Sequence, residues 1–260
     1  MKLYRLSARM SHAGFMFLKK LTSFLDLVHT GFWLGILGEK GLDYSDELFY
    51  NNSKHYLDDK YNESGLYEWE KMMIGKHFSN VNRILLIAAG GGRETLALGK
   101  MGKDTDSYEC NPALIAYGND LLARNNIKHE IKYLPRNSMP EAGNYDGIII
   151  GWGAYSLMRG KKTRLSFLEK VKPFMKSGTP LMISFLYTTE RTGRDRTIKK
   201  ISDFFRFFRR GHETELGDRL VPDFIHYFTE DEIRREMSAA GLKTDDYYAS
   251  EYGCLIAGIS

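Results

Sequence analysis

The chain has 260 residues, of which 43% are hydrophobic and 27% are charged, and its formal net charge at pH 7 is +4. This composition excludes a disordered or fibrous chain and favours a globular core domain with an added segment. The positive charge is modest and no recognised RNA-binding module is present, so we expect no nucleic-acid partner.

The cysteines and the first residues indicate where the protein works. Cys110 and Cys254 lie far apart in the sequence, which gives neither a disulfide framework nor the spacing of metal ligands. Lys19, Lys20 and Asp26 interrupt the apolar stretches near the N-terminus before a signal or a membrane span forms. We therefore expect a cytoplasmic protein without a metal, a targeting segment or a membrane partner.

Residues 1–80 are expected to form a helical N-terminal cap that is unusually rich in aromatic side chains. Large rings are buried by default, so the simplest interpretation is a bundle whose aromatics form its core. These aromatics are Phe15, Phe17, Phe24, Phe32, Trp33, Tyr44, Phe49, Tyr50, Tyr56, Tyr61, Tyr67 and Trp69.

Residues 84–98 are the most informative segment, because an apolar strand runs into a glycine-rich turn and then into a helix. Glycines at 90–92 let the backbone approach a ligand, and the helix that follows offers unpaired N–H groups. Glu109, at the end of the next strand, stands where ribose-binding acids stand in dinucleotide folds. A dinucleotide fingerprint would need a third glycine at the position of Thr95, so NAD is disfavoured.

Strands and helices alternate over the remainder of the chain. Asn111 and Pro112 supply an N-cap and a first helical position. The apolar run at 145–151 is typical of a strand that is covered on both faces in a parallel sheet. Thr229 and Glu232 predict a capping box for a later helix. The other predicted elements are strands at 129–134 and 180–185, a helix over 165–171, a helix over 229–240 and a terminal strand pair at 242–250 and 252–259.

The glycine turn resembles motif I of the class I S-adenosylmethionine (SAM)-dependent methyltransferases, in which a strand ends in acid-x-G-x-G-x-G. Aligned in this way, Ala88, Gly90 and Gly92 stand at the three glycine positions and Leu86 stands at the acid position. In the family that acid helps to orient the amino group of SAM, so the backbone carbonyls of the loop are its expected substitute here. The resemblance implies an α/β fold, with a doubly wound, Rossmann-like seven-stranded sheet whose last strand is antiparallel.

The same resemblance implies how the chain is divided. Residues 81–260 would form the SAM-binding methyltransferase domain, and the cap at 1–80 would close the SAM site. Residues 187–226 would form a helical insertion after the fifth strand, where this family commonly places its substrate-recognition elements.

SAM, and its demethylated product S-adenosylhomocysteine, are the cofactors that the resemblance implies. Glu109 would bind the ribose hydroxyls, and a polar residue of the turn at 135–140 would meet the adenine amino group. One tyrosine among Tyr50, Tyr56 and Tyr61 would reach the SAM carboxylate. The cofactor-binding residues predicted in this way are Ala88, Ala89, Gly90, Gly91, Gly92, Glu109, Cys110, Asn111, Asn137, Ser138, Gly151, Trp152, Gly153, Tyr50 and Tyr61.

The insertion is strongly basic. We predict that Arg191, Arg194 and Arg196 bind the acceptor, because arginine suits the bidentate recognition of a carboxylate or phosphate. The alternative is that these charges form a solvated helix face.

Short motifs at 90–94, 151–156 and 226–229 are similar to those of methyltransferases from bacterial peptide natural-product clusters, including enzymes that esterify the C-terminal carboxylate of lanthipeptides. A carboxylate on a peptide or small acid is therefore the expected acceptor, and it is already ionised at neutral pH. Two alternatives stay open: a small-molecule O- or N-methyltransferase, and a non-catalytic SAM-binding or partner-binding protein.

A phenol, alcohol or amine acceptor would need a catalytic base. His226, Tyr155 and His212 are the candidates for that role. Tyr155 follows the strand that ends at 151, so it is also expected to border the acceptor.

Overall fold

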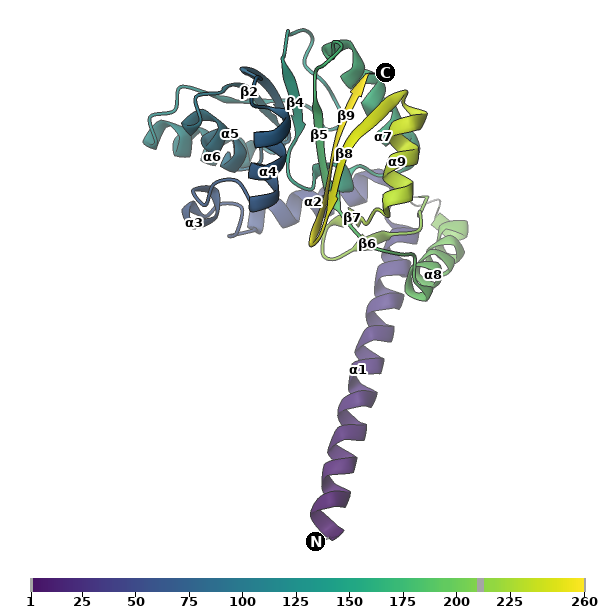
Figure 1. Cartoon of the computed structure of the whole chain (residues 1–260). Coiled ribbons are helices and arrows are strands. Elements are labelled where there is room, and N and C mark those ends of the chain that lie inside the picture. Colours follow the sequence, from purple (N-terminus) through teal and green to yellow (C-terminus); the bar gives the residue numbers. More distant parts are fainter. Residues whose placement is uncertain (1, 210–212, 260) are drawn as a thin grey trace.

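The computed structural model describes residues 2–209 and 213–259, and a seven-stranded sheet forms its centre (Figure 1). The strands lie in the order β3-β2-β1-β4-β5-β9-β8. Strands β3 to β5 are parallel, and β9 runs antiparallel to both of its neighbours. Their bounds are β1 Arg83–Ile87, β2 Asp104–Glu109, β3 Ile131–Tyr133, β4 Gly147–Ile150, β5 Leu181–Leu186, β8 Leu242–Ala249 and β9 Tyr252–Ile259. The sheet predicted from the sequence is confirmed, including its antiparallel last strand.

Helices cover both faces of the sheet because the side chains of each strand alternate between two hydrophobic clusters. In β1, Leu85 and Ile87 belong to one cluster, and Ile84 and Leu86 belong to the other. The first cluster contains side chains of α7 and α9, and the second contains side chains of α4, α5 and α6. These helices are α4 Glu68–His77, α5 Arg93–Lys100, α6 Pro112–Arg124, α7 Lys161–Val171 and α9 Glu230–Ala239. Because α4 shares the core of the sheet, part of the predicted cap is built into it.

The remaining elements come from the N-terminal segment, from the insertion and from two short 3₁₀ helices. They are α1 Lys2–Ile36, α2 Glu39–Asn52, α3 Asp59–Asn62, η1 Ala154–Leu157, η2 Lys172–Phe174, α8 Gly193–Arg209, β6 Asp218–Leu220 and β7 Phe224–His226. β6 and β7 pair as an antiparallel hairpin. The predicted insertion is therefore helical only in its first half.

Helix α1 has 35 residues and projects from the body of the molecule (Figure 1). Its end lies against α8, where a Cβ on Gly31 or Gly35 would collide with α8 atoms. Phe15, Phe17 and Phe24 are 64%, 66% and 57% exposed. The expectation that the aromatics of the cap form a core is wrong for these three residues. Among the helices of the described ranges, none combines the length and apolarity that crossing a bilayer requires.

Helix α9 begins after Thr229 as predicted, but the predicted capping box is wrong. The Thr229 side chain makes no capping hydrogen bond. The Glu232 carboxylate instead pairs with Arg191 and lies near His226, with 3.3 Å between Glu232 Oε1 and His226 Nε2. Charge-assisted contacts are about twice as strong as neutral hydrogen bonds, so the tertiary partners outcompete the local cap.

Candidate functional site

A cavity of about 570 Å³ lies at the carboxyl ends of the parallel strands. The ends of β1, β2 and β5 line it, together with the residues that follow β4. Residues of α2 and α3 line it as well. Ligands of open α/β sheets bind at this edge, and small-molecule sites have this size.

The backbone of the loop after β1 follows the motif I alignment. Ala88, Gly90 and Gly92 have positive φ angles of 61°, 56° and 98°. The three positions aligned with the family's glycines are therefore the left-handed positions of the loop. A Cβ on Gly90 would meet no atom within 4 Å, so the backbone there faces open space that a ligand can enter. An alanine in the left-handed region costs roughly 1–2 kcal/mol, so Ala88 carries strain.

Two of the predicted cofactor-binding glycines pack against neighbouring elements and do not line the cavity. A Cβ on Gly151 would collide with the carbonyl oxygen of Ala88. A Cβ on Gly92 would lie 3.4 Å from the Cα of Gly118 in α6. Gly92 and Gly151 therefore allow the close packing of the elements that border the site.

Glu109 ends β2, lines the cavity and is almost fully buried. Its carboxylate accepts backbone N–H groups from Gly90 at 2.9 Å, Cys110 at 2.8 Å and Asn111 at 2.9 Å. A carboxylate has about four acceptor positions, so one is left for a ligand hydroxyl. Asn111 caps α6 with its side chain, as predicted.

Glu94, in the first turn of α5, also lines the cavity, and the sequence analysis missed it. Its Oε1 accepts the backbone N–H of Trp152 at 3.1 Å and the Arg93 guanidinium at 2.8 Å. Arg93 is buried and donates two further hydrogen bonds to Glu70 of α4, at 2.6 and 2.7 Å. Burial raises the pKa of Glu70 even though Arg93 lowers it. An acid in the first turn of the helix that follows the glycines was the available signal for Glu94.

Tyrosines of the cap form one wall of the cavity. Tyr50, Tyr56 and Tyr61 all line the cavity. The Tyr50 hydroxyl donates to the Asp223 carboxylate at 3.3 Å. Burial raises the pKa of Tyr56 to about 12, so its hydroxyl remains a donor at neutral pH. Burial also raises the pKa of Asp223 to about 6, so this carboxyl group can exchange a proton near neutrality.

The part of the cavity beside Tyr50 is acidic. Asp43 and Glu47 precede Tyr50 in α2 at helical spacing and line the cavity with Asp223. The Arg136 guanidinium lines it too, with 2.6 Å between Arg136 Nη1 and the buried Asp46 Oδ2, and Arg159 shares this Asp46 oxygen and also pairs with Asp43. The carboxylates of Asp43, Asp46, Glu47 and Asp223 still outnumber these two guanidinium groups. This arrangement suits a neutral or cationic group better than an anion.

Most of the predicted cofactor-binding residues are brought together around the cavity. They are Ala88, Ala89, Gly90, Gly91, Glu109, Cys110, Asn111, Asn137, Ser138, Trp152, Gly153, Tyr50 and Tyr61. Glu94, Arg136 and Asp223 also line the cavity and were not predicted from the sequence. Nothing in the local sequence separates Asp223 or Arg136 from ordinary surface charges.

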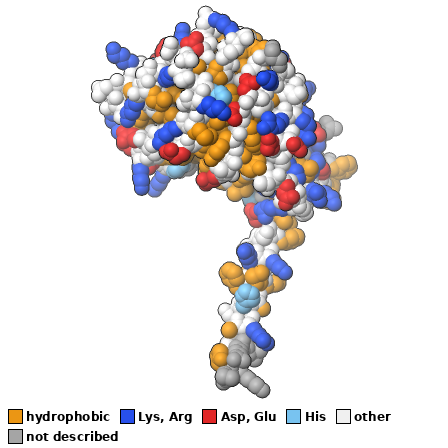
Figure 2. All heavy atoms as spheres, in the orientation of Figure 1, with side chains coloured by type: hydrophobic (Ala, Val, Ile, Leu, Met, Phe, Trp, Pro, Cys, Tyr) orange, Lys and Arg blue, Asp and Glu red, His pale blue; other side chains and the backbone are white. Residues whose placement is uncertain are grey.

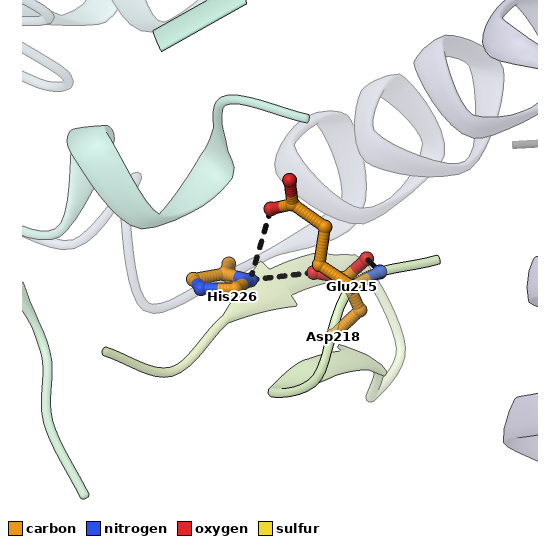
Figure 3. A group of neighbouring side chains, drawn as sticks. All are labelled: Glu215, Asp218 and His226. Atoms are coloured by element: carbon orange, nitrogen blue, oxygen red, sulfur yellow. Dashed lines mark hydrogen bonds and ion pairs between the residues drawn. The ribbon is translucent and has the colours of Figure 1, made fainter. Parts of the chain in front are cut away.

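His226, a predicted base, is fully buried and does not line the cavity. Figure 3 shows its ring beside Glu215 and Asp218, with 2.6 Å between His226 Nδ1 and Asp218 Oδ1. Burial lowers the pKa of His226, but hydrogen bonds to Asp218 and Glu232 outweigh it and raise the pKa above its ordinary value. An enclosed ring outside the cavity lining is not placed to accept a proton from an acceptor in the cavity, so we assign His226 a structural role.

Tyr155, predicted as a catalytic and acceptor-bordering residue, is also buried outside the cavity lining. Its hydroxyl donates to Glu236 at 2.8 Å. Arg164 bridges Glu236 and Glu215, at 2.7 Å to each. This network ties η1, α7 and α9 to the insertion. The third candidate base, His212, lies outside the described residues.

One group of side chains has the composition of a metal site. Glu215, Asp218 and His226 each place a ligand-type atom within 4.8 Å of the others. However, the Arg164 guanidinium donates to Glu215, and the Asp218 carboxylate lies 2.6 Å from His226 Nδ1 and raises the pKa of that imidazole. Both carboxylates are already engaged by protein side chains, so we describe the group as a buried polar network.

The three arginines predicted to bind the acceptor are not brought to the cavity. Arg191 pairs with Glu232, and Arg194 pairs with Asp26 of α1. Arg196 is exposed on α8. Two of these charges thus hold the insertion against α9 and α1.

The strand order, the left-handed glycine loop and the acid at the end of β2 give the chain the fold of the class I SAM-dependent methyltransferases. No family model and no curated protein matches the sequence. A SAM-dependent methyltransferase from Methanosarcina mazei superposes with a TM-score of 0.60 at 17% identity, covering 75% of this chain and 100% of its own.

Two further solved structures have the same architecture. The CcbJ methyltransferase from Streptomyces caelestis gives a TM-score of 0.57 at 10% identity, covering 82% of this chain and 96% of its own. The glycopeptide N-methyltransferase MtfA, in complex with SAM, gives a TM-score of 0.55 at 12% identity, covering 74% of this chain and 93% of its own. At these identities the similarity establishes the fold alone.

Proposed function

We propose that the protein is an enzyme that transfers the methyl group of SAM to an acceptor held in the same cavity. The observation that carries the proposal is that the left-handed loop at 88–92 and the Glu109 carboxylate meet at one cavity. The structure of MtfA, whose fold is similar, is a complex with SAM, which supports the same choice of cofactor.

The chemistry of the lining residues fits SAM. The remaining acceptor position of Glu109 suits a ribose hydroxyl. The Glu94 carboxylate suits the ammonium group of the methionine moiety, and it replaces the acid that is missing at Leu86. The hydroxyls of Tyr56 and Tyr61, whose pKa values burial raises, are donors for the methionine carboxylate. Polar side chains of the turn after β3 suit the edge of adenine.

SAM supplies an electrophilic methyl group on its sulfonium when it is bound. The protein holds the acceptor in line with that methyl group, and such positioning lowers a barrier by about 7–11 kcal/mol. Trp152 and the tyrosine wall enclose the cavity and restrict water. Asp223, with a pKa of about 6, is the lining carboxyl group best suited to take the proton that an amine or hydroxyl loses.

The acceptor we propose is an amine or hydroxyl group on a small molecule or peptide. Asp43, Glu47 and Asp223 make the cavity beside α2 acidic, and the arginines of the insertion lie outside its lining. A carboxylate acceptor is the second candidate, because Arg136 lines the cavity. It is the weaker one, since the carboxylates of Asp43, Asp46, Glu47 and Asp223 outnumber the guanidinium groups of Arg136 and Arg159 in this region.

Calorimetry with SAM and S-adenosylhomocysteine is the first test, followed by methyl transfer from labelled SAM to a panel of amines, alcohols, carboxylic acids and peptides. We expect both nucleosides to bind and amines or alcohols to be methylated. Asp223→Asn should lower kcat by about 10²–10⁴-fold and leave the Kd for SAM nearly unchanged. Asp231→Asn, on the exposed first turn of α9, is the matched control.

Three outcomes would contradict parts of the proposal. A folded protein that binds neither nucleoside is not a SAM enzyme. Binding without transfer to any acceptor would favour a non-catalytic SAM-binding protein. Transfer that is restricted to carboxylic acids and indifferent to Asp223→Asn would restore the carboxylate acceptor.

A further inference from the structure

The protruding part of α1, residues 7–25, exposes large apolar side chains in the open. Figures 1 and 2 show it extending beyond the body of the molecule, with apolar and basic side chains along it. Its exposed apolar residues are Met10, Phe15, Met16, Phe17, Leu18, Leu21, Phe24 and Leu25. Monomeric soluble proteins rarely expose apolar patches larger than a few hundred Å², so a surface of this extent marks an interaction site.

The side chains of this segment are sorted by type around the helix. At about 100° per residue, Arg9, His12, Lys19 and Lys20 fall within a sector of roughly 100°. Seven of the eight exposed apolar residues occupy a separate sector of roughly 180°, and Met16 is the exception. A helix with one basic face and one broad apolar face is suited to the boundary between water and hydrocarbon.

The charge of the segment selects an anionic partner. Residues 1–25 contain five Lys and Arg and no Asp or Glu. The first acid of the chain, Asp26, pairs with Arg194 where α1 joins the body. The basic charge of the protruding segment is therefore not balanced within the segment.

Exposed aromatics of α8 adjoin the base of α1. The rings of Phe32 and Phe205 contact each other at 4.7 Å between centroids, and Phe205 contacts Phe204. Phe204, Phe207 and Phe208 are exposed. The apolar surface of α1 thus continues onto the neighbouring helix.

We propose that residues 7–25 of α1 lie along the surface of a membrane that contains anionic phospholipids, with the phenylalanines in the acyl boundary and the basic face at the headgroups. This interaction surface is independent of the proposed function, and it departs from the sequence-based expectation of no membrane partner. The segment is roughly 28 Å long, which gives room for several headgroup contacts.

A second copy of the chain fits this surface less well. A two-stranded coiled coil buries a narrow seam, and an apolar sector of roughly 180° is much broader than that seam. Pairing two α1 helices would also bring their unbalanced basic residues together. A lipid surface covers the whole apolar sector and supplies the opposite charge.

Co-sedimentation of the full chain with vesicles tests the proposal. The probes are vesicles of phosphatidylcholine alone and vesicles of equal parts phosphatidylcholine and phosphatidylglycerol. We expect binding to the anionic vesicles, much weaker binding to the neutral ones, and a loss of binding as salt is raised.

Two variants separate the two faces. Phe17→Glu and the double variant Lys19→Glu, Lys20→Glu should each weaken binding to anionic vesicles by about tenfold or more. Met101→Glu, which replaces an exposed apolar residue at the end of α5, should leave vesicle binding unchanged. If the wild type binds SAM, all three variants should bind it with the same affinity. The vesicle-binding test and the SAM-binding test of the proposed function can therefore fail separately.

Two results would overturn the proposal. The wild-type chain could fail to bind anionic vesicles, or Met101→Glu could reduce binding as much as Phe17→Glu does. Light scattering that shows a dimer which Phe17→Glu dissociates, in a chain that ignores vesicles, would assign the surface to a second copy.

Discussion

The Glu109 carboxylate accepts a hydrogen bond from the backbone N–H of Gly90, with 2.9 Å between Gly90 N and Glu109 Oε2. This bond joins the end of β2 to the loop after β1. The other carboxylate oxygen accepts two N–H groups just before α6. The side chain that we assign to the ribose therefore also holds together the two backbone segments that border it.

This double role determines which substitution is informative. Glu109→Ala would remove the ligand contact and all three structural bonds together. Glu109→Gln keeps the size of the side chain and one carbonyl oxygen, but it loses the charge. The loss of a hydrogen bond to a charged group costs about 1.5–3 kcal/mol. We expect Glu109→Gln to bind SAM roughly tenfold or more weakly and to melt at a lower temperature.

Calorimetry and thermal unfolding measure the two effects separately. Glu141→Gln, at an exposed position, is the control and should change neither. An unchanged SAM affinity in folded Glu109→Gln would remove Glu109 from the ribose site.

The features that the sequence predicted correctly depend on local backbone rules. Gly90 and Gly92 stand at left-handed positions, and Asn111 stands at a helix N-cap, because few residue types tolerate those conformations. The alternation of apolar runs and helices predicts an α/β sheet, and the plan of that sheet came from the resemblance to the methyltransferase family. These signals lie within a few residues of the structure that they specify.

The features that the sequence could not supply depend on which side chains meet after folding. Glu232 has the spacing of a capping residue, yet it pairs with Arg191, which is distant in the sequence. Burial raises the pKa of Asp223, even though the hydrogen bond from Tyr50, which lies on another element, lowers it. The helical periodicity of α1 can be read from the sequence. The sequence does not show whether the aromatic face of this helix meets a partner within the chain.

A second prediction concerns the ion pairs behind the cavity. Arg93→Met removes the cation that Glu70 and Glu94 share in a buried setting. Removing one partner of a buried pair costs about 3–5 kcal/mol, because the remaining charge is left uncompensated. Urea unfolding should show that loss. Lys71→Met, which breaks an exposed pair with Glu68, should cost only about 0–1 kcal/mol. Equal losses in the two variants would contradict the assigned burial.

A third prediction concerns the approach of β4 to the glycine loop. Gly151→Ala places a Cβ against the carbonyl oxygen of Ala88, and such overpacking costs about 1–3 kcal/mol. Ala88→Gly relieves a left-handed alanine, so it should not lower stability despite the added freedom of the unfolded chain. Gly14→Ala, where a Cβ meets no atom within 4 Å, is the control for alanine substitution. If calorimetric melting showed Gly151→Ala to be as stable as the wild type, the close packing of Gly151 against Ala88 would be contradicted.

The last prediction uses the protonation of His226. Its pKa in the folded protein is raised, because the hydrogen bonds to Asp218 and Glu232 outweigh the effect of burial. The unfolded chain has the ordinary value of about 6.5. A raised folded pKa gives stability that is fully present below about pH 6.5 and is lost as the pH rises through the folded value.

The free energy of unfolding should therefore fall in the window above about pH 6.5, and His226→Gln should flatten this fall. Asp223, with a folded pKa of about 6, completes its own titration mostly below this window, so its contribution is separable. His12→Gln, on the exposed part of α1, should leave the slope unchanged. Urea unfolding at a series of pH values measures the slope of the free energy of unfolding against pH. If His226→Gln retained the wild-type slope, His226 would not be the protonated centre of the network that joins the insertion to α9.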